Sequence, residues 1–477
     1  MKKIFIAALL PLLVVVGCKK DLTSLNSDPK RPEQAPAAPF FTGAQKIFVD
    51  LQTTADYNEN NFRLIMQYWQ QTIYVKESRY DLIDRQIPRQ VWDYYYRDVI
   101  RDLREAKRLV PLDASLTEAV KKNQHAIAEI MEIYTWYYLV TTFGDIPYTD
   151  ALDVMKPSPK YDDDQAIFTD LLARLDVAIN DLTTTAASYG TADVLYNGNV
   201  DKWKKFANSI KLKMGMTIAD ADNTKAKSAV ESAVASGVFT SNADNATYQY
   251  LTSAPNNNPT YEFFVTDARE EDFVVASTIA NRMNTLNDPR RDEYFTVDAS
   301  NSYSGGAPGA PSDFGAFSKP SPEITATDYA PTILDYAEVE FLLAEAIERG
   351  YNVGGTAIEH YNKAVTASIE DWGGTAADAL AYLAQPSVNY ATAGTTYKAK
   401  IGNQKWIALF NRPWDAWIEW RRLDYPQLTP ATDAVSAIPV RFTYPIGEQN
   451  VNKTNYDAAA GAIGGDVVTS KLFWDKN

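Results

Sequence analysis

Apolar residues recur at helical spacing through most of this chain, and this period constrains the fold more than any other feature. The first two runs are Phe41, Ala44, Ile47, Phe48 and Leu51, and then Phe62, Ile65, Met66, Trp69 and Ile73. Side chains three or four residues apart share one face of an α-helix. The pattern returns at about 92–106, 130–137, 164–182, 200–219, 224–236, 331–349, 355–371 and 402–423. We therefore predict amphipathic helices that pack in pairs.

Strand signals are sparse, and two long stretches have no helical period. Short strand candidates lie at 238–240, 247–251 and 441–444, next to Asn, Gly, Ser or Pro. Residues 253–272 and 298–330 contain Pro, Gly and Asn but also carry aromatic residues, namely Tyr261, Phe263, Phe264, Tyr303, Phe314 and Phe317. Loops this long are usually functional or disordered, and disordered segments are poor in aromatics. The sequence predicts a mainly α fold with a few short strands and two surface loops.

The N-terminus has the pattern of a bacterial lipoprotein signal. Lys2 and Lys3 precede thirteen apolar residues, 4–16, and Gly17 stands directly before Cys18, the only cysteine. The apolar run is too short to span a bilayer, so we predict a signal peptide over 1–17. Cys18 would then carry the lipid, residues 18–38 would form a Pro-rich tether, and 39–477 would form a single domain. The alternative is a plain secretory signal with an incidental cysteine.

Charge and hydropathy exclude several classes of partner. The formal net charge is −15, and removal of residues 1–17 with their two lysines takes it to −17. An acidic chain with no run of Lys or Arg lacks the basic face that phosphate backbones need, so we predict no nucleic-acid partner. Nothing after residue 17 approaches 18 consecutive apolar residues. We therefore expect membrane contact through the acyl anchor alone.

Residues that could perform chemistry are few. The chain has only His125 and His360, and its single cysteine is assigned to the lipid, so no catalytic triad and no metal site is predicted. The run 162–164 consists of three aspartates before a helix, where we favour helix capping over metal binding. The tryptophans at 406, 414, 417 and 420 favour core packing, with arginine stacked on indole. A carboxylate pair for glycoside hydrolysis stays open, because such acids need meet only in space.

Several short segments, in this order, resemble one protein family. They are Asn26–Pro29, Trp136–Tyr138 with Phe143–Tyr148 (FGDIPY), Asn287–Arg290, Glu338–Glu345 (EVEFLLAE), Gln404–Trp406, Trp417–Arg422 (WIEWRR), and Tyr444–Pro445 with Glu448. Each is weak alone, but together they span nearly the whole mature chain. The sequence resembles the SusD/RagB nutrient-binding outer-membrane lipoproteins, in the SusD-like branch. In FGDIPY, Gly144 and Pro147 predict a fixed corner after a helix, which is structural.

The resemblance implies a fold and a function. The fold is a single domain of degenerate tetratricopeptide-like helix pairs with loop-rich insertions. Members act as lids on a SusC-like TonB-dependent transporter in the outer membrane, where they capture glycans or, in the RagB-like case, peptides. They bind without cleaving bonds, so no enzyme activity and no cofactor is expected. The alternatives are a lipid-anchored surface glycoside hydrolase and a helical scaffold protein without a small ligand.

The resemblance also implies where ligand would bind. Family contacts come from the segment after the first helix pair and from mid-chain loops. The matching candidates in this chain are Trp69, Tyr74, Arg79, Tyr80, Asn258, Tyr261, Phe264, Tyr303 and Phe317. Tyr and Phe offer stacking faces, whereas Asn and Arg offer hydrogen bonds to hydroxyls or peptide groups. We predict that Tyr80 and Tyr261 share one partly exposed pocket with Arg79 at its edge. Trp69 continues an apolar stripe, which favours core packing for that residue.

Overall fold

The computed structural model describes residues 35–476. Its residues from Ala37 to Lys476 belong to one compact unit. The expected signal peptide, Cys18 and the tether up to residue 34 lie outside the described residues. The first helix, α1, begins at Ala37, so it takes in the last two residues of the expected 18–38 tether.

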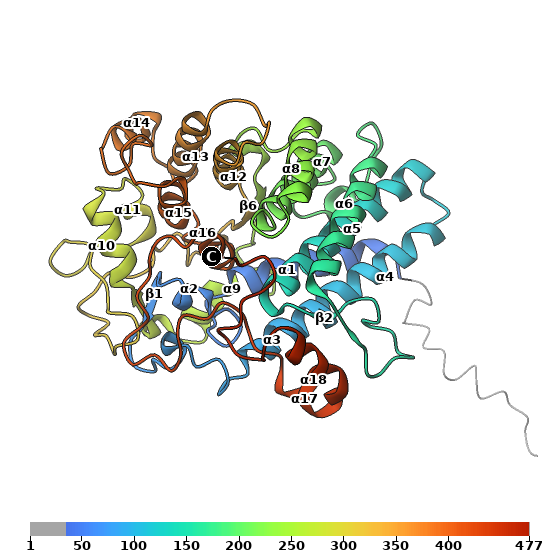
Figure 1. The fold of residues 1–477 in the computed structure, drawn as a ribbon, viewed down its shortest axis with the longest axis horizontal. Coiled ribbons are helices and arrows are strands. Elements are labelled where there is room, and N and C mark those ends of the chain that lie inside the picture. The colour runs from blue at the N-terminus through green and yellow to red at the C-terminus, as the bar shows by residue number, and fades with distance from the viewer. Residues whose placement is uncertain (1–34, 477) are drawn as a thin grey trace, which may run out of the picture. The chain divides into compact units, whose positions relative to one another are not determined.

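Helices alternate with loops along the described chain (Figure 1). Those of the first half are α1 (Ala37–Thr53), α2 (Phe62–Ile65), α3 (Ile87–Asp93), α4 (Arg101–Leu109), α5 (Glu118–Phe143), α6 (Asp164–Asp181), α7 (Val200–Thr217) and α8 (Asn223–Ser236). Those of the second half are α9 (Pro259–Tyr261), α10 (Ser277–Thr285), α11 (Arg291–Tyr294), α12 (Tyr336–Glu348), α13 (Ala357–Asp371), α14 (Ala376–Leu383), α15 (Tyr397–Ala408), α16 (Pro413–Leu423), α17 (Ile446–Val451) and α18 (Lys453–Ala462). A π-helical stretch, Tyr94–Ile100, joins α3 to α4.

Neighbouring helices in the chain pack against each other in pairs. The most extensive contacts join α12 with α13, α7 with α8, and α5 with α6. Side-chain caps help to start these helices: Thr117 caps α5, and Thr356 forms a capping box with Glu359 in α13. Residues 237–335 interrupt the series between α8 and α12 with loops and short elements. The expected fold, degenerate tetratricopeptide-like pairs with loop-rich insertions, is confirmed.

The described strands form three short antiparallel ribbons. β1 (Trp69–Gln71) pairs with β5 (Phe273–Val275), β2 (Ile146–Pro147) with β3 (Tyr161–Asp162), and β4 (Ala246–Thr247) with β6 (Thr332–Leu334). Of the expected strands, 247–251 contributes only its first residue, and 238–240 and 441–444 are not strands. The ribbons join segments that are far apart in sequence, and this pairing has no local signal.

Two expected helices are shorter than their apolar stripes. The stripe 62–73 forms only the single turn α2, because Gln67 adopts φ 57° and the chain then enters β1. Trp69 stays buried as expected, but it pairs with Val275 in a ribbon and does not continue a helix. The stretch 402–423 is split into α15 and α16 by Pro413, which occupies the first turn of α16.

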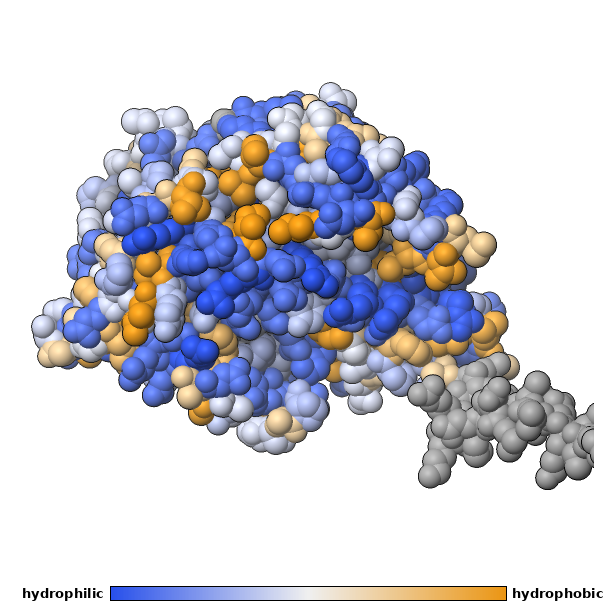
Figure 2. Space-filling view, turned by 90° about the horizontal axis from the view of Figure 1, so that it is seen from below, coloured by the Kyte–Doolittle hydropathy of each residue, from blue (hydrophilic) through white to orange (hydrophobic). Residues whose placement is uncertain are grey.

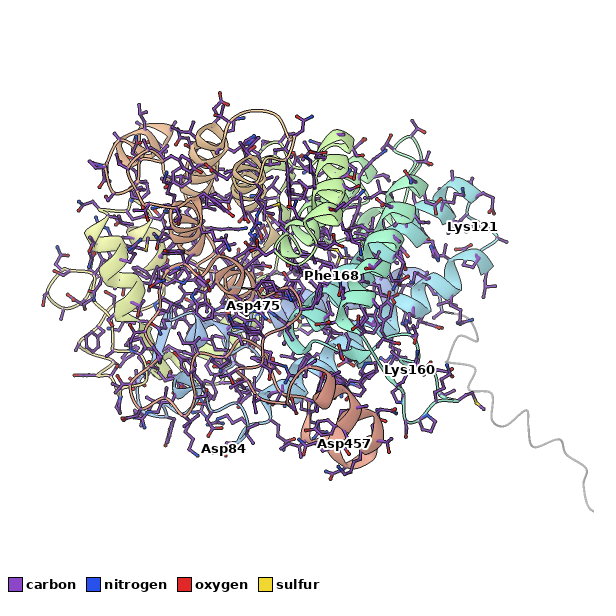
Figure 3. All side chains as sticks on the ribbon, viewed as in Figure 1. Asp84, Lys121, Lys160, Phe168, Asp457 and Asp475 are labelled. Carbon is purple, nitrogen blue, oxygen red and sulfur yellow. The ribbon has the colours of Figure 1, made fainter. Side chains whose placement is uncertain are left out.

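The outside of the unit is polar with scattered apolar side chains. Figure 2 shows small separate apolar spots among hydrophilic residues on the face seen from below. In Figure 3, Phe168 lies among the helices, whereas Lys121 and Asp457 lie at the margin of the molecule. Among the described residues, we find no helix with the length and apolarity that crossing a bilayer requires. Single exposed apolar residues are ordinary on a protein surface.

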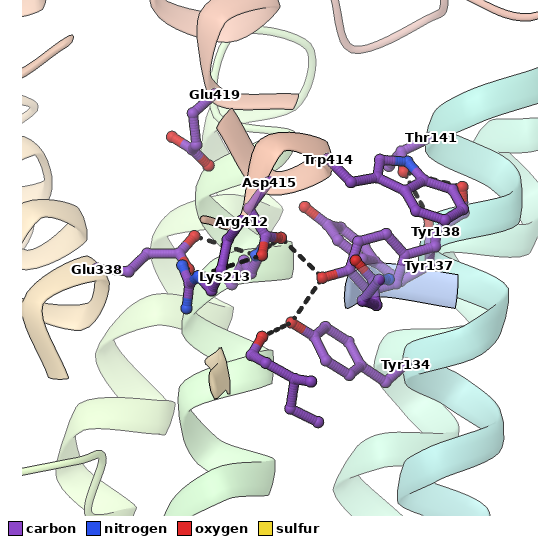
Figure 4. A network of polar contacts seen from close by, with 12 residues as sticks. Tyr134, Tyr137, Tyr138, Thr141, Lys213, Glu338, Arg412, Trp414, Asp415 and Glu419 are labelled. Carbon is purple, nitrogen blue, oxygen red and sulfur yellow. Dashed lines mark hydrogen bonds and ion pairs between the residues drawn. The ribbon is translucent and has the colours of Figure 1, made fainter. Parts of the chain in front are cut away.

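A fully buried group of charges joins three helices in the core (Figure 4). Lys213 of α7 lies 3.0 Å from Glu338 of α12 and is ion-paired with Asp415 of α16. Tyr138 donates its hydroxyl to the same aspartate over 2.7 Å, and Arg412 pairs with Glu338. Burial alone would raise the pKa of Glu338, but Lys213 and Arg412 hold it well below its ordinary value. Each charge in this group therefore stabilises the opposite charges beside it, and removal of one would leave a buried charge without a partner.

The charged residues of the recurrent motifs pair with one another. Glu345 of EVEFLLAE accepts hydrogen bonds from two nitrogens of Arg422 in WIEWRR. Arg422 also donates to Glu419 over 2.6 Å, and Lys405 lies 2.8 Å from Glu419. Burial opposes the charge of Glu345, but Arg422 and then Arg349 lower its pKa to about 2. These motifs hold α12, α15 and α16 together, so their role is structural.

The expected corner after α5 is present. The helix ends at Phe143, and Gly144 adopts φ 85°, where a Cβ atom would lie 2.8 Å from Leu472 Cδ2. Asp163 caps α6 by accepting from the Ala166 amide, as expected for the acidic run. Asp145 accepts from the amide of Asp164 over 3.0 Å. Among the described residues, these three aspartates are the only carboxylate, histidine or cysteine group compact enough for a metal ion, and their capping bonds account for their positions.

Asp164→Asn is expected to raise the free energy of unfolding at pH 8 by about 1–3 kcal/mol. Burial, and then Asp145, raise the pKa of Asp164 to about 7. The stability that this raised pKa contributes is fully present below about pH 4 and is lost as the pH rises through about 7. At pH 8 the buried charge opposes folding, and the amide removes it. Urea unfolding at about pH 5 and about pH 8 measures the change in the free energy of unfolding. The control is Asp457→Asn, at an exposed carboxylate. An equal increase in stability at both pH values, or a similar increase in the control, would contradict the prediction.

Candidate functional site

Two large side chains stand out from the molecule where β1 ends. Ile73 is 72% exposed and Tyr74 is 65% exposed. The residue before them, Thr72, is fixed from both sides: its amide donates to Asp272 O over 3.0 Å, and its carbonyl accepts from the Ser312 amide over 2.8 Å. Beyond that point the chain leaves the ribbon. The two side chains therefore project from an anchored backbone.

The loop that holds Ser312 brings three more aromatic rings to the surface. Tyr303, Phe314 and Phe317 are each half-buried. Two hydrogen bonds between Ser304 and Ser318 tie the ends of this loop together. The Ser304 amide donates to Ser318 Oγ, and the Ser318 amide donates to Ser304 O. We call Ile73, Tyr74, Tyr303, Phe314 and Phe317 the aromatic loop face. Its elements meet through the bond between Thr72 and Ser312.

Charged side chains lie against two rings of the aromatic loop face, Tyr303 and Phe314. Tyr303 donates its hydroxyl to Asp292 over 2.7 Å, and the Arg291 guanidinium lies 5.4 Å from the centre of its ring. Burial, and then Asp292, raise the pKa of Tyr303 to about 12. The Lys319 ammonium lies 4.7 Å from the centre of the Phe314 ring. Polar groups therefore stand beside half-exposed rings.

Arg79 joins three loops next to this face. Its Nε donates to Gly309 O over 2.8 Å, and its Nη2 lies 3.1 Å from Asp433 Oδ2. Its carbonyl accepts from the amide of Val435, a residue whose side chain is 67% exposed. Gly309 has φ 81°, and a Cβ atom there would lie 2.3 Å from Thr432 O. Arg79 is partly exposed, as expected, but its hydrogen bonds serve to fix the loops.

The prediction that Tyr80 and Tyr261 share a partly exposed pocket is wrong. Tyr80 is 2% exposed and belongs to the main core. Its hydroxyl accepts from the Ala431 amide over 3.1 Å and from the Gln67 side chain over 3.4 Å. Burial raises its pKa. The loss of helical period after Ile73 suggested a loop open to solvent, but the C-terminal segment near Ala431 covers Tyr80. Tyr261 lies half-buried in α9.

Three other candidates are buried and cannot meet a ligand at the surface. Trp69 and Phe264 do come together, with ring centres 5.8 Å apart, but both belong to the main core. Asn258 is fully buried, caps α9 by accepting from the Thr260 amide, and donates to Ile324 O and Ala326 O. Their roles are packing and loop closure. Of the remaining candidates, Tyr74 is exposed, and Arg79, Tyr261, Tyr303 and Phe317 are each half-buried.

Sequence reasoning missed two residues of the aromatic loop face. Phe314 lies in the same loop as Tyr303 and Phe317, so the aromatic content of 298–330 was the available signal. Ile73 fell at the end of an apparent helical stripe, and only the switch to β1 turns it outward. The aromatic side chains of this face offer flat apolar surfaces, and charged groups lie beside Tyr303 and Phe314. Such a surface suits stacking against the C–H face of a sugar.

Comparison with known proteins assigns the chain to a family. The family model SusD-like, described as "Starch-binding associating with outer membrane", matches residues 29–445. No curated protein matches the chain. Proteins of this family bind ligands without catalysis, so the chain is a binding protein and not an enzyme.

Solved structures of similar proteins cover nearly the whole chain. One, titled a chitin-binding protein, is 26% identical with a TM-score of 0.80, over 92% of this chain and 100% of that one. A SusD homologue from Bacteroides uniformis is 26% identical with a TM-score of 0.76, over 93% and 100%. A chitin-binding SusD homologue from Flavobacterium johnsoniae is 24% identical with a TM-score of 0.79, over 92% and 99%, and shares the fold. With a family model that spans most of its length, this chain belongs to the SusD-like family of outer-membrane-associated binding proteins.

Proposed function

We propose that this protein is a cell-surface lipoprotein that captures an oligosaccharide at the aromatic loop face and delivers it to a SusC-like TonB-dependent transporter as its lid. The family match over residues 29–445 is the observation that carries the proposal. The exposed rings of the aromatic loop face support a sugar ligand, because a pyranose presents an apolar C–H face to an aromatic ring. A peptide is the second ligand class, as in RagB-like proteins.

Two glycan classes come first among the candidates. The family description names starch, and a relative with 26% identity is titled chitin-binding. Both glycans are chains of pyranose rings, whose apolar C–H faces stack on Tyr74 and Phe317. A surface of several separate rings suits successive sugar units better than one enclosed unit. Lipid tethering at Cys18 would keep the captured chain at high local concentration beside the transporter.

Isothermal titration calorimetry tests the ligand. The Cys18→Ala protein is titrated with chitin oligosaccharides, malto-oligosaccharides and short peptides of matched length. We expect a saturable signal with one of the glycan series and an affinity that increases with chain length, since each added unit reaches another ring. A signal with peptides alone would reject the glycan proposal. No signal with any of them, from a protein that folds normally, would reject capture by this chain.

Cys18→Ala is expected to release the protein from the membrane without changing its fold. The cysteine lies outside the described residues, and the hydrophobic core is built from residues between Phe41 and Trp474. Stable attachment needs the acyl chains, because no described helix could replace them. Membrane fractionation after a carbonate wash, in cells that lack the transporter partner, measures the effect. Ser24→Ala in the same segment is the control and should stay attached; a Cys18→Ala protein that remains in the membrane fraction would contradict the anchor.

A further inference from the structure

His360, near the start of α13, lies between helix α12 and the turn of residues 349–356 that joins α12 to α13. The residue is 7% exposed. Its Nδ1 lies 2.6 Å from Glu340 Oε2 on α12, and its Nε2 lies 3.0 Å from the carbonyl oxygen of Gly354 in the turn. Glu340 is itself buried. The ring therefore joins a helix to a turn through both of its nitrogens.

Both contacts exist together only when the ring and the carboxylate share an extra proton. A carbonyl oxygen has no proton to donate, so Nε2 must be the donor to Gly354. A neutral imidazole carries only one N–H, so its bare Nδ1 would then face the ionised Glu340 carboxylate, with two acceptors 2.6 Å apart. The observed geometry therefore needs one proton more than a neutral ring beside an ionised carboxylate carries.

The groups that contact the ring favour this extra proton. Burial lowers the pKa of His360, but the hydrogen bonds to Glu340 and Gly354 and the charge of Glu340 raise it above its ordinary value. Lys363, on the next turn of α13, opposes this rise. The proton is therefore held by the two groups that the ring contacts.

Other titratable side chains nearby have partners of their own. The Glu359 carboxylate accepts from the Thr356 amide over 2.8 Å in the capping box of α13. Tyr336 lies one turn before Glu340 on α12, and burial, followed by the Glu340 charge, raises its pKa. From α8, Glu231 accepts from a turn amide, that of Asn352, over 2.7 Å.

The turn has a backbone that can reorient. Gly354 and Gly355 have φ 82° and 66°, and a Cβ atom on Gly355 would lie 2.8 Å from His360 Nε2. Two consecutive glycines adopt alternative conformations at little steric cost. The hydrogen bond from His360 therefore helps to fix a segment that is otherwise weakly constrained.

Loss of the proton breaks one of the two contacts. A hydrogen bond to a carboxylate is stronger than one to a neutral carbonyl, so a neutral ring keeps its N–H on Glu340 and faces Gly354 without a donor. We propose that His360 is a proton-dependent latch, which as an imidazolium joins the turn to α12 and on deprotonation releases the turn at Gly354. This latch does not depend on the ligand of the aromatic loop face.

Release of the turn also affects a neighbouring helix pair. Besides the bond from Asn352 to Glu231, the Lys227 ammonium of α8 lies 3.4 Å from Gly350 O. The latch therefore supports the contact between the pairs α7–α8 and α12–α13. Its contribution to stability is fully present below about pH 6.5 and is lost as the pH rises through the raised pKa of His360.

NMR titration of the histidines tests the latch. His125 and His360 are the only two in the chain, so untagged, histidine-labelled Cys18→Ala protein gives two imidazole signals, which His125→Gln assigns. We expect the pKa of His360 above 6.5 and that of His125 below it, because burial and then Lys107 lower the latter. Glu340→Gln should lower the pKa of His360. A pKa for His360 at or below 6.5, or one that Glu340→Gln leaves unchanged, would overturn the latch.

Hydrogen exchange measures the turn itself. Amides of residues 350–356 are compared below and above the midpoint of His360, after correction for the intrinsic pH dependence of exchange. We expect exchange above the midpoint to increase by about three- to tenfold, the scale of one lost hydrogen bond. The turn at Gly373–Gly374 after α13 is the matched control, since it has a glycine pair but no histidine, and should not change. In His360→Gln, whose side chain does not titrate, the increase should disappear. An equal increase in both turns, or one that persists in His360→Gln, would overturn the proposal.

Discussion

Arg422→Ala is expected to lower the free energy of unfolding by about 3–5 kcal/mol, because breaking a buried ion pair leaves an uncompensated charge in the core. The change removes the partner of two buried carboxylates, Glu345 and Glu419. Arg349 and Lys405 remain near them, but neither can replace the paired geometry that Arg422 supplies. Two buried negative charges would then lose their principal cation. Urea unfolding followed by circular dichroism measures the loss.

A double variant separates lost charge pairing from lost packing. In Glu345→Leu with Arg422→Met, the charges of this pair are replaced by apolar side chains, so part of the lost stability should return, while Glu419 keeps only Lys405 as its cation. The surface pair Lys453–Asp457 offers a matched comparison, and Lys453→Ala should change stability little because both side chains are exposed. If Arg422→Ala lowered the free energy of unfolding as little as Lys453→Ala does, the buried charges around Arg422 would not hold α12 and α16 together.

Tyr74→Ala combined with Phe317→Ala is expected to weaken oligosaccharide binding by about tenfold or more, while the protein stays folded. Tyr74 is 65% exposed and Phe317 is half-buried, so the core loses little when they are truncated. A stacked sugar ring would lose its partner at both positions. Calorimetric titration with the glycan series that binds the unmodified protein measures the change.

The matched control for this prediction lies on the helical side of the molecule. Val177 of α6 is 63% exposed, so Val177→Ala also removes exposed apolar surface and should leave affinity unchanged. Tyr80→Phe is a second control, because it removes a hydrogen bond from a buried residue that we exclude from the site. Unchanged affinity in the double variant would show that the glycan binds elsewhere on the protein.

Helical content and core positions were predictable from the sequence because they depend on local periodicity. Phe41, Phe48 and Leu51 are buried on α1, and Trp414 and Trp417 pack in the core, with the Arg421 guanidinium 3.5 Å from the centre of the Trp417 ring. The corner at Gly144 was also predictable, since a positive φ and a following proline are local constraints. The order of the motifs was sufficient to predict the family, but it did not predict the role of each residue.

The candidate site depended on tertiary contacts that leave no local pattern. Tyr74 and Tyr80 lie six residues apart with the same side chain, yet one is exposed and the other is covered by the segment near Ala431. Asn258 looked like a ligand for hydroxyl groups but closes a loop against Ile324 and Ala326. The sequence by itself determined the helices, the core stripes and the family. Only the tertiary structure decided which aromatic residues reach solvent, because burial depends on segments that return from far along the chain.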